Sequence, residues 1–188
     1  MIIHFICRGN SFRSIIAEAY LNSLKVGGTT VISSGTVAAL HKAENLVYYR
    51  MTLALLERHG IREYAKTSHG DQLTQSCLEK SDISVCLNRR VYDDCLQIVT
   101  FPARPRIWSV ADVGEPGRVA HTDSERQLYR EEAYQEIVEN VDRLVSDISL
   151  PGRPALPQVT SPAPGPVRAI SSPRRRLADR IDVPSSRI

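Results

Sequence analysis

Near its N-terminus the chain reads IIHFICRGNSFRS over residues 2–14. The apolar run at residues 2–6 is short, which is typical of a buried strand. Turn formers then dominate residues 7–13, so a loop is expected to follow the strand directly. From Ser14 onward, apolar residues recur at spacings of three and four, which predicts a helix. This stretch decides the fold, because it places a strand, a tight loop and a helix in immediate succession.

Strand-like and helical segments alternate through the rest of the chain. Strands are predicted at residues 29–34, 82–87 and 97–101, and helices at residues 43–59 and 123–148. Such alternation favours an α/β fold, namely a doubly wound parallel four-stranded sheet with helices on both faces. Ligands of such sheets bind beyond the carboxyl ends of the strands, so the loop after the first strand is the candidate site.

The two later helices carry signals at their ends. Gly60 stands where a C-terminal cap glycine belongs. Thr122 and Glu125 have the spacing of a capping box at the start of the last helix. One side of the helix at residues 43–59 is expected to present Val47, Met51, Ala54, Leu55 and Arg58.

Composition divides the 188 residues into two parts. The chain is 42% hydrophobic and 24% charged, which is close to a soluble globular domain. Residues 151–188, however, hold eight of the eleven prolines, with seven arginines against two aspartates and no apolar periodicity. We therefore expect one domain over residues 1–150, followed by a disordered tail rich in proline, serine and arginine.

The same sequence argues against a membrane protein. No stretch approaches the roughly 20 apolar residues that span a bilayer. The apolar start is too short for a signal peptide, and it lacks the basic leader that a signal peptide has. A cytoplasmic location is the expectation.

Cys7 and Arg13 form a C-x5-R motif across the predicted loop. Loop amides that point inward, together with a helix N-terminus, make an anion site and favour a thiolate at the cysteine. The planar guanidinium of Arg13 matches two phosphoryl oxygens. The competing interpretation is a buried cysteine at a strand end beside an exposed arginine. The strand–loop–helix setting favours a phosphate site with a cysteine nucleophile.

The intervening residues suit such a loop. Gly9 permits close approach of the backbone, and Asn10 tolerates left-handed geometry. The hydroxyl of Ser14 can donate to the thiolate. The expected phosphate-binding residues are Arg8, Gly9, Asn10, Ser11, Phe12, Arg13 and Ser14.

The segment from Cys7 to Ser14 resembles the phosphate-binding loop of the low-molecular-weight protein tyrosine phosphatase family, C-x-G-N-x-x-R-S. The segments Ile16–Ala19, Ser33–Thr36 and Arg58–Ile61 resemble further landmarks of that family, and the likeness covers roughly residues 1–150. The resemblance implies a phosphatase that acts on phosphotyrosine in proteins through a phosphocysteine intermediate. It implies no metal and no cofactor.

The resemblance also implies a general acid. The family uses an aspartate in a late loop, usually within an Asp-Pro pair, and Asp112 occupies that place without the proline. Glu115 and Asp123 are nearby competitors. Phe12 stands where many family members have a cysteine that pairs with the nucleophile. Asp112 would protonate the leaving oxygen and then deprotonate the water that releases phosphate.

Two other substrate classes share this loop. Phosphoarginine is one, since some family members carry a small hydroxyl residue at the position of Ser11. Arsenate is the other, because thioredoxin-coupled arsenate reductases resemble the loop and a tryptophan, here Trp108. Those reductases need two more cysteines, and the candidates are Cys86 and Cys95. We expect instead that Cys86 packs in the core and that Cys95 is an incidental surface thiol.

A hypothesis of a different class is a non-catalytic phosphate-binding module. The basic run at residues 174–176 would then dock on an acidic partner, while nucleic acid is not favoured as a partner. Turnover of an aryl phosphate separates the two. For the enzyme, the expected partner is a phosphorylated protein, and Tyr48 and Tyr49 are candidates to line the pocket mouth.

Overall fold

The structure is a computed structural model, and it describes residues 1–112, 115 and 118–149. The predicted tail at residues 151–188 lies outside the described residues, so its predicted disorder and binding role stay predictions. The elements in chain order are β1 (Ile2–Cys7), α1 (Arg13–Ser23), β2 (Thr30–Gly35), α2 (Lys42–Arg58), the 3-10 helix η1 (Arg62–Tyr64), α3 (Gln75–Glu79), β3 (Ile83–Cys86), α4 (Arg89–Cys95), β4 (Arg106–Ile107) and α5 (Asp123–Ser149).

The four strands form one sheet in the order β2-β1-β3-β4, and every neighbouring pair is parallel. This confirms the predicted α/β class and the parallel four-stranded sheet. From the central strand β1, the chain moves first to one side and later to the other. The carboxyl end of β1 is therefore the topological switch point, where such sheets bind ligands.

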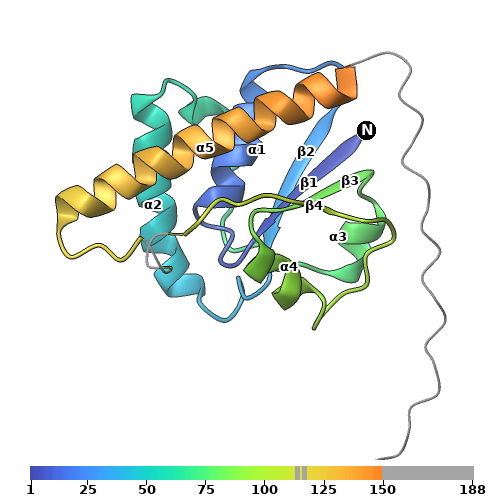
Figure 1. Ribbon diagram of the computed structural model, residues 1–188, viewed down its shortest axis with the longest axis horizontal. Coiled ribbons are helices and arrows are strands. Elements are labelled where there is room, and N and C mark those ends of the chain that lie inside the picture. Colours follow the sequence, from blue (N-terminus) through green and yellow to red (C-terminus); the bar gives the residue numbers. More distant parts are fainter. Residues whose placement is uncertain (113–114, 116–117, 150–188) are drawn as a thin grey trace, which may run out of the picture. The chain divides into compact units, whose positions relative to one another are not determined.

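Helices cover both faces of the sheet, as predicted (Figure 1). Side chains alternate along β1, so Ile3 and Phe5 belong to a core cluster shared with α1 and α5. Ile6 points the other way, into a second cluster with Leu78 of α3 and Cys95 of α4. Each fully buried aliphatic or aromatic side chain of this kind contributes about 1.5–3 kcal/mol to folding.

The strand predicted at residues 97–101 is wrong. The fourth strand is Arg106–Ile107 instead. Val99 donates its amide to the carbonyl of Cys95, which extends the end of α4 into a turn. Val99 and Phe101 pack in and against the second core cluster. Their apolar side chains, two residues apart, therefore gave the sequence the alternation that is typical of a strand.

The helix α2 forms where it was predicted, but of the five residues expected along one side only Leu55 is buried. Val47 and Met51 are 55% and 42% exposed. The buried residues are Asn45, Tyr49, Thr52, Leu55 and Leu56. Part of this helix packs on the polar loop after β1, so polar side chains take the inward positions and hydrophobicity does not mark the face. The expected cap is confirmed, since Gly60 adopts a φ of 68° just beyond the helix.

The predicted capping box of α5 is confirmed. The amide of Glu125 donates to Thr122 Oγ1 at 3.1 Å, and the amide of Thr122 donates to a Glu125 carboxylate oxygen at 3.0 Å. These two reciprocal bonds fix the start of the helix. The helix faces the core through its buried residues Ala133, Tyr134, Ile137, Val141 and Leu144.

Candidate functional site

The loop between β1 and α1 lies directly over the end of β2. Asn10 adopts a φ of 48°, the left-handed conformation expected for it. A Cβ at Gly35, the last residue of β2, would lie 2.5 Å from the carbonyl oxygen of Arg8 and 2.7 Å from the amide of Asn10. A glycine is therefore required beneath the loop.

The thiol of Cys7 lies at the base of this loop. Its sulfur is 3.1 Å from Ser14 Oγ, and the amide of Asn10 donates to it at 3.2 Å. Cys7 is only 3% exposed. Two hydrogen-bonding groups therefore converge on one sulfur atom.

The guanidinium of Arg13 is held from two sides. It donates to the carbonyl oxygen of Val110 at 2.9 Å and to the Asp112 carboxylate at 2.6 Å. The side chain is 1% exposed, so its charge is taken out of water and needs these partners. Through Arg13, the residues after β4 are tied to the loop after β1.

A cavity of about 300 Å³ opens over the loop. It is lined by Cys7, Arg8, Gly9, Ser11, Phe12, Arg13, Val37, His41, Glu44, Asn45, Tyr48, Asp112 and Arg130. The structure thus brings together most of the predicted site residues around one space. Asn10 and Ser14 do not line the cavity, and both are buried behind its wall.

Asp112 is the one of the three candidate acids that lines this cavity. Both carboxylate oxygens of Glu115 accept from the side-chain amide nitrogen of Asn88, and one of them also accepts from the backbone amide of Asp112. Asp123 pairs with Arg126 at the exposed start of α5. Glu115 therefore holds the loop that carries Asp112.

Asn10 is the centre of a hydrogen-bond network that the sequence analysis missed. Its amide nitrogen donates to Ser33 Oγ at 2.8 Å and to Ser14 Oγ at 3.1 Å. Its amide oxygen accepts from Lys66 Nζ at 2.9 Å and from the backbone amide of Asp71 at 3.0 Å. The side chain of Asn10 therefore connects Ser14, which is hydrogen-bonded to Cys7, with β2 and with the segment after η1.

Glu18 of α1 closes the network underneath. Ser33 Oγ donates to its carboxylate, and Lys66 Nζ lies 3.8 Å away. Burial raises the pKa of Glu18 above its ordinary value, although Lys66 opposes that shift. No signal in the sequence marked Lys66, because it stands in a loop far from the motif.

Lys66→Met is expected to lower the free energy of unfolding by about 1–3 kcal/mol at neutral pH. The change removes the cation that offsets the buried Glu18 carboxylate. Because the folded-state pKa of Glu18 is raised, its ionisation costs stability as pH rises through the range between the unfolded and folded values. The loss should therefore shrink below about pH 4.3, where glutamate is also protonated in the unfolded chain.

Urea unfolding of the variant and the parent, at neutral pH and below about pH 4.3, measures this difference in the free energy of unfolding. Lys80→Met is the matched control, because Lys80 is exposed at the end of α3. An equal loss for both variants, or a loss of the same size at both pH values, would remove Glu18 from the explanation.

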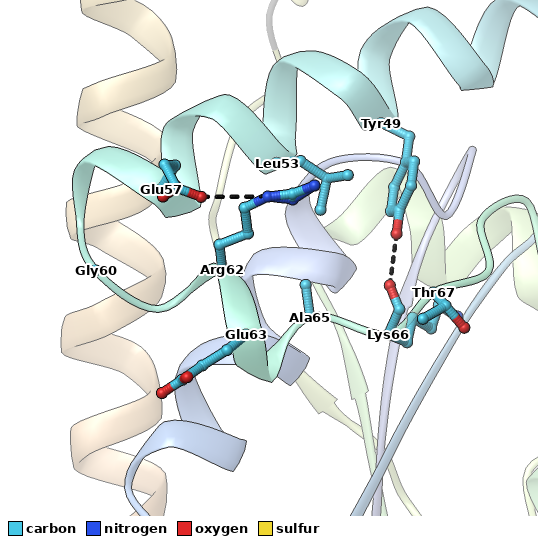
Figure 2. A pocket seen from close by; sticks show the side chains of 9 residues that line it. All are labelled: Tyr49, Leu53, Glu57, Gly60, Arg62, Glu63, Ala65, Lys66 and Thr67. Atoms are coloured by element: carbon cyan, nitrogen blue, oxygen red, sulfur yellow. Dashed lines mark hydrogen bonds and ion pairs between the residues drawn. The ribbon is translucent and has the colours of Figure 1, made fainter.

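A second, larger cavity has Lys66 among its lining residues (Figure 2). It measures about 720 Å³ and is lined by Tyr49, Leu53, Glu57, Gly60, Arg62, Glu63, Ala65, Lys66 and Thr67. Tyr49 donates its hydroxyl to the carbonyl oxygen of Lys66, and Arg62 pairs with Glu57 at 3.2 Å. None of the loop residues lines it. Of the two tyrosines expected at the pocket mouth, Tyr48 lines the loop cavity, whereas the expectation for Tyr49 is wrong.

The remaining cysteines divide differently from the expectation. Cys86 lies in the core as expected, but Cys95 is buried as well, so its expected place on the surface is wrong. Cys95 faces inward from α4 and packs with Ile6 and Cys86 in the second core cluster. Its hydrogen bond with Cys86, together with burial, raises the pKa of the Cys86 thiol far above its ordinary value.

The fold places the loop that carries Cys7 and Arg13 at the topological switch point of a parallel α/β sheet. The family model described as low molecular weight phosphotyrosine protein phosphatase matches residues 2–149. The chain belongs to the low molecular weight phosphotyrosine protein phosphatase family. No curated protein sequence matches the chain.

Solved structures of the same fold include tyrosine and arginine phosphatases. Wzb from Vibrio vulnificus, in complex with benzylphosphonate, is 20% identical, with a TM-score of 0.56 over 78% of this chain and 97% of that one. Wzb from Escherichia coli K30, in complex with sulphate, is 17% identical, with a TM-score of 0.56 over 79% and 98%. The Drosophila arginine phosphatase is 17% identical, with a TM-score of 0.57 over 81% and 100%. At these identities the likeness establishes the fold.

The described helices also bear on membrane association. Across residues 1–112, 115 and 118–149, no helical segment combines the length and apolarity that a bilayer crossing requires.

Proposed function

We propose that this protein hydrolyses phosphotyrosine in protein substrates, with Cys7 as the nucleophile. The observation that carries the proposal is the sulfur of Cys7, which lies at the cavity that Arg13 and Asp112 also line. Ser14 and the amide of Asn10 stabilise the thiolate from behind. The nucleophile, the phosphate ligand and the acid thus share one space of about 300 Å³.

In the first step, the Cys7 thiolate attacks phosphorus and a sulfur–phosphorus bond forms. The bond to the tyrosine oxygen breaks as Asp112 gives that oxygen its proton. Arg13 and the loop amides bind the equatorial phosphoryl oxygens while charge shifts toward the leaving oxygen. Asp112 enters this step as the carboxylic acid. Arg13 donates to one of its carboxyl oxygens at 2.6 Å, so the group that binds phosphate also places the acid next to it.

In the second step, water attacks the phosphocysteine and gives its proton to Asp112. The sulfur–phosphorus bond breaks, and phosphate and the Cys7 thiolate are released. The Ser14 hydroxyl, 3.1 Å from the sulfur, stabilises the departing thiolate by donating a hydrogen bond. The cycle returns the carboxylic acid and the thiolate to their starting states.

The cavity walls support an aromatic substrate. Phe12, Val37 and Tyr48 line the cavity above the loop. Tyr48 is 52% exposed at the first turns of α2, where its ring can stack on a substrate ring. A flat phenyl ring between the loop and this rim would place its phosphate at Cys7.

Phosphoarginine is the second candidate, and the observation that favours it is Glu44. Its carboxylate lines the same cavity and could pair with a substrate guanidinium. Matched peptides carrying phosphotyrosine or phosphoarginine test the choice through their values of kcat/KM. We expect the phosphotyrosine peptide to be favoured. The opposite order would make phosphoarginine the substrate, and binding without turnover of either peptide or of p-nitrophenyl phosphate would support a non-catalytic module.

Cys86→Ser with Cys95→Ser should leave phosphatase kcat/KM within about threefold of the parent protein. Neither thiol lines the cavity, and both are held in the second core cluster, so they are poorly placed to relay oxidation from Cys7. Arsenate should act mainly as a competitive inhibitor. The measurement is p-nitrophenyl phosphate hydrolysis with and without arsenate, beside a thioredoxin-coupled arsenate assay. Steady arsenate reduction that disappears in the double variant would instead assign a reductase.

A further inference from the structure

Two of the three arginines that line the loop cavity have an aspartate as a neighbour. Arg8 lies 3.3 Å from Asp94. Arg13 and Asp112 form the pair described above. Glu44 also lines the cavity, and His41 Nδ1 lies 3.3 Å from its carboxylate.

Arg130 is different. It reaches the cavity from α5, and its guanidinium donates to the sulfur of Met51 at 3.3 Å. A thioether is a weak acceptor, and a guanidinium has five N–H donors. Within the described part of the chain, no carboxylate oxygen lies within 4.0 Å of this guanidinium. Within the described residues, Arg130 is therefore the cavity-lining arginine without a carboxylate partner.

We propose that Arg130 selects substrates that carry an acidic residue beside the phosphotyrosine. The inference rests on the proposed function, because it assumes that a phosphotyrosine side chain fills the cavity. The peptide backbone must then cross the rim, since the cavity holds little more than the side chain. A flanking carboxylate can accept two parallel hydrogen bonds from Arg130, whereas a flanking lysine would meet like charge.

Two phosphotyrosine peptides of equal length, one with glutamates and one with glutamines on both sides, test the proposal. We expect the parent protein to favour the acidic peptide roughly two- to fivefold in kcat/KM, the range for a partly exposed ion pair. Arg130→Gln should bring the ratio close to one. Because each ratio compares two substrates of the same variant, a general loss of activity cancels.

Arg126→Gln is the matched control. Arg126 lies on the same helix but pairs with Asp123 and does not line the cavity, so this variant should keep the parent ratio. Arg130→Lys should keep part of the preference, because the charge remains while the planar fork is lost. The parent preference should also fall as salt is raised.

Each outcome bears on one of the two claims. Equal kcat/KM for both peptides in the parent protein, or an unchanged ratio in Arg130→Gln, overturns the role of Arg130. If Arg130→Gln does not fold, a parent ratio that ignores salt overturns it as well. Hydrolysis of p-nitrophenyl phosphate without hydrolysis of either peptide would count against the proposed phosphotyrosine substrate itself.

Discussion

Cys7→Ser should reduce hydrolysis of p-nitrophenyl phosphate by about 10⁴-fold or more, the scale of loss when a nucleophile is removed. Serine is nearly isosteric with cysteine, but its hydroxyl is not ionised at neutral pH. The hydrogen bonds from Ser14 and the amide of Asn10 would then converge on a neutral oxygen. The measurement is kcat for the purified variant beside the parent protein.

Folding must be checked in the same variant. Thermal unfolding should be nearly unchanged, because a buried atom is replaced by a slightly smaller one. Cys77→Ser is the matched control, since Cys77 is a partly exposed thiol on α3, away from the cavity, and its loss should leave kcat unaltered. Near-parental activity in Cys7→Ser would show that phosphate transfer does not pass through this sulfur.

Asp112→Asn is expected to lower kcat on phenyl phosphate by about 10²-fold or more, the usual contribution of a general acid. The loss on p-nitrophenyl phosphate should be clearly smaller, because nitrophenolate leaves without much protonation. Asparagine keeps an oxygen that can accept the hydrogen bond from Arg13, now made at 2.6 Å, so the loop is expected to stay in place. The informative quantity is the ratio of the two losses.

Glu115→Gln separates the acid from its support. Glu115 accepts the backbone amide of Asp112 at 2.9 Å, so its replacement should change both substrates by a similar and smaller factor. An equal loss on the two substrates in Asp112→Asn would show that this aspartate does not donate the proton. A leaving-group dependence that appears in Glu115→Gln would move the role to Glu115.

Local patterns were enough to predict the strand, loop and helix around Cys7 and Arg13, because all three elements lie within one continuous segment. The same is true of the α5 capping box, whose two partners are three residues apart. The prediction of Asp112 needed the family resemblance, since 99 residues separate it from Arg13 in the sequence. Its role as the acid stays a prediction.

Other features depended on tertiary context that no local pattern records. The buried side of α2 was misassigned because Thr52 donates to the carbonyl oxygen of Ser11, and so a polar residue faces inward. Residues 97–101 were predicted as a strand because Val99 and Phe101 are apolar. These two side chains instead pack with the cluster around Ile6, on the face of the sheet covered by α3 and α4. Lys66 was not predicted because its role depends on its contacts with Asn10 and Glu18, which lie far from it in the sequence.

The two bonds to the amide oxygen of Asn10 also bear on when the protein becomes functional. Lys66 and Asp71 follow Asn10 by 56 and 61 residues. Contacts so distant along the chain close slowly, because a long loop must be ordered before they form. A nascent polypeptide could therefore build β1 and α1 early and still lack a finished thiol pocket until residue 71 has left the ribosome. In refolding, the return of enzyme turnover should accordingly lag behind the return of helical circular dichroism.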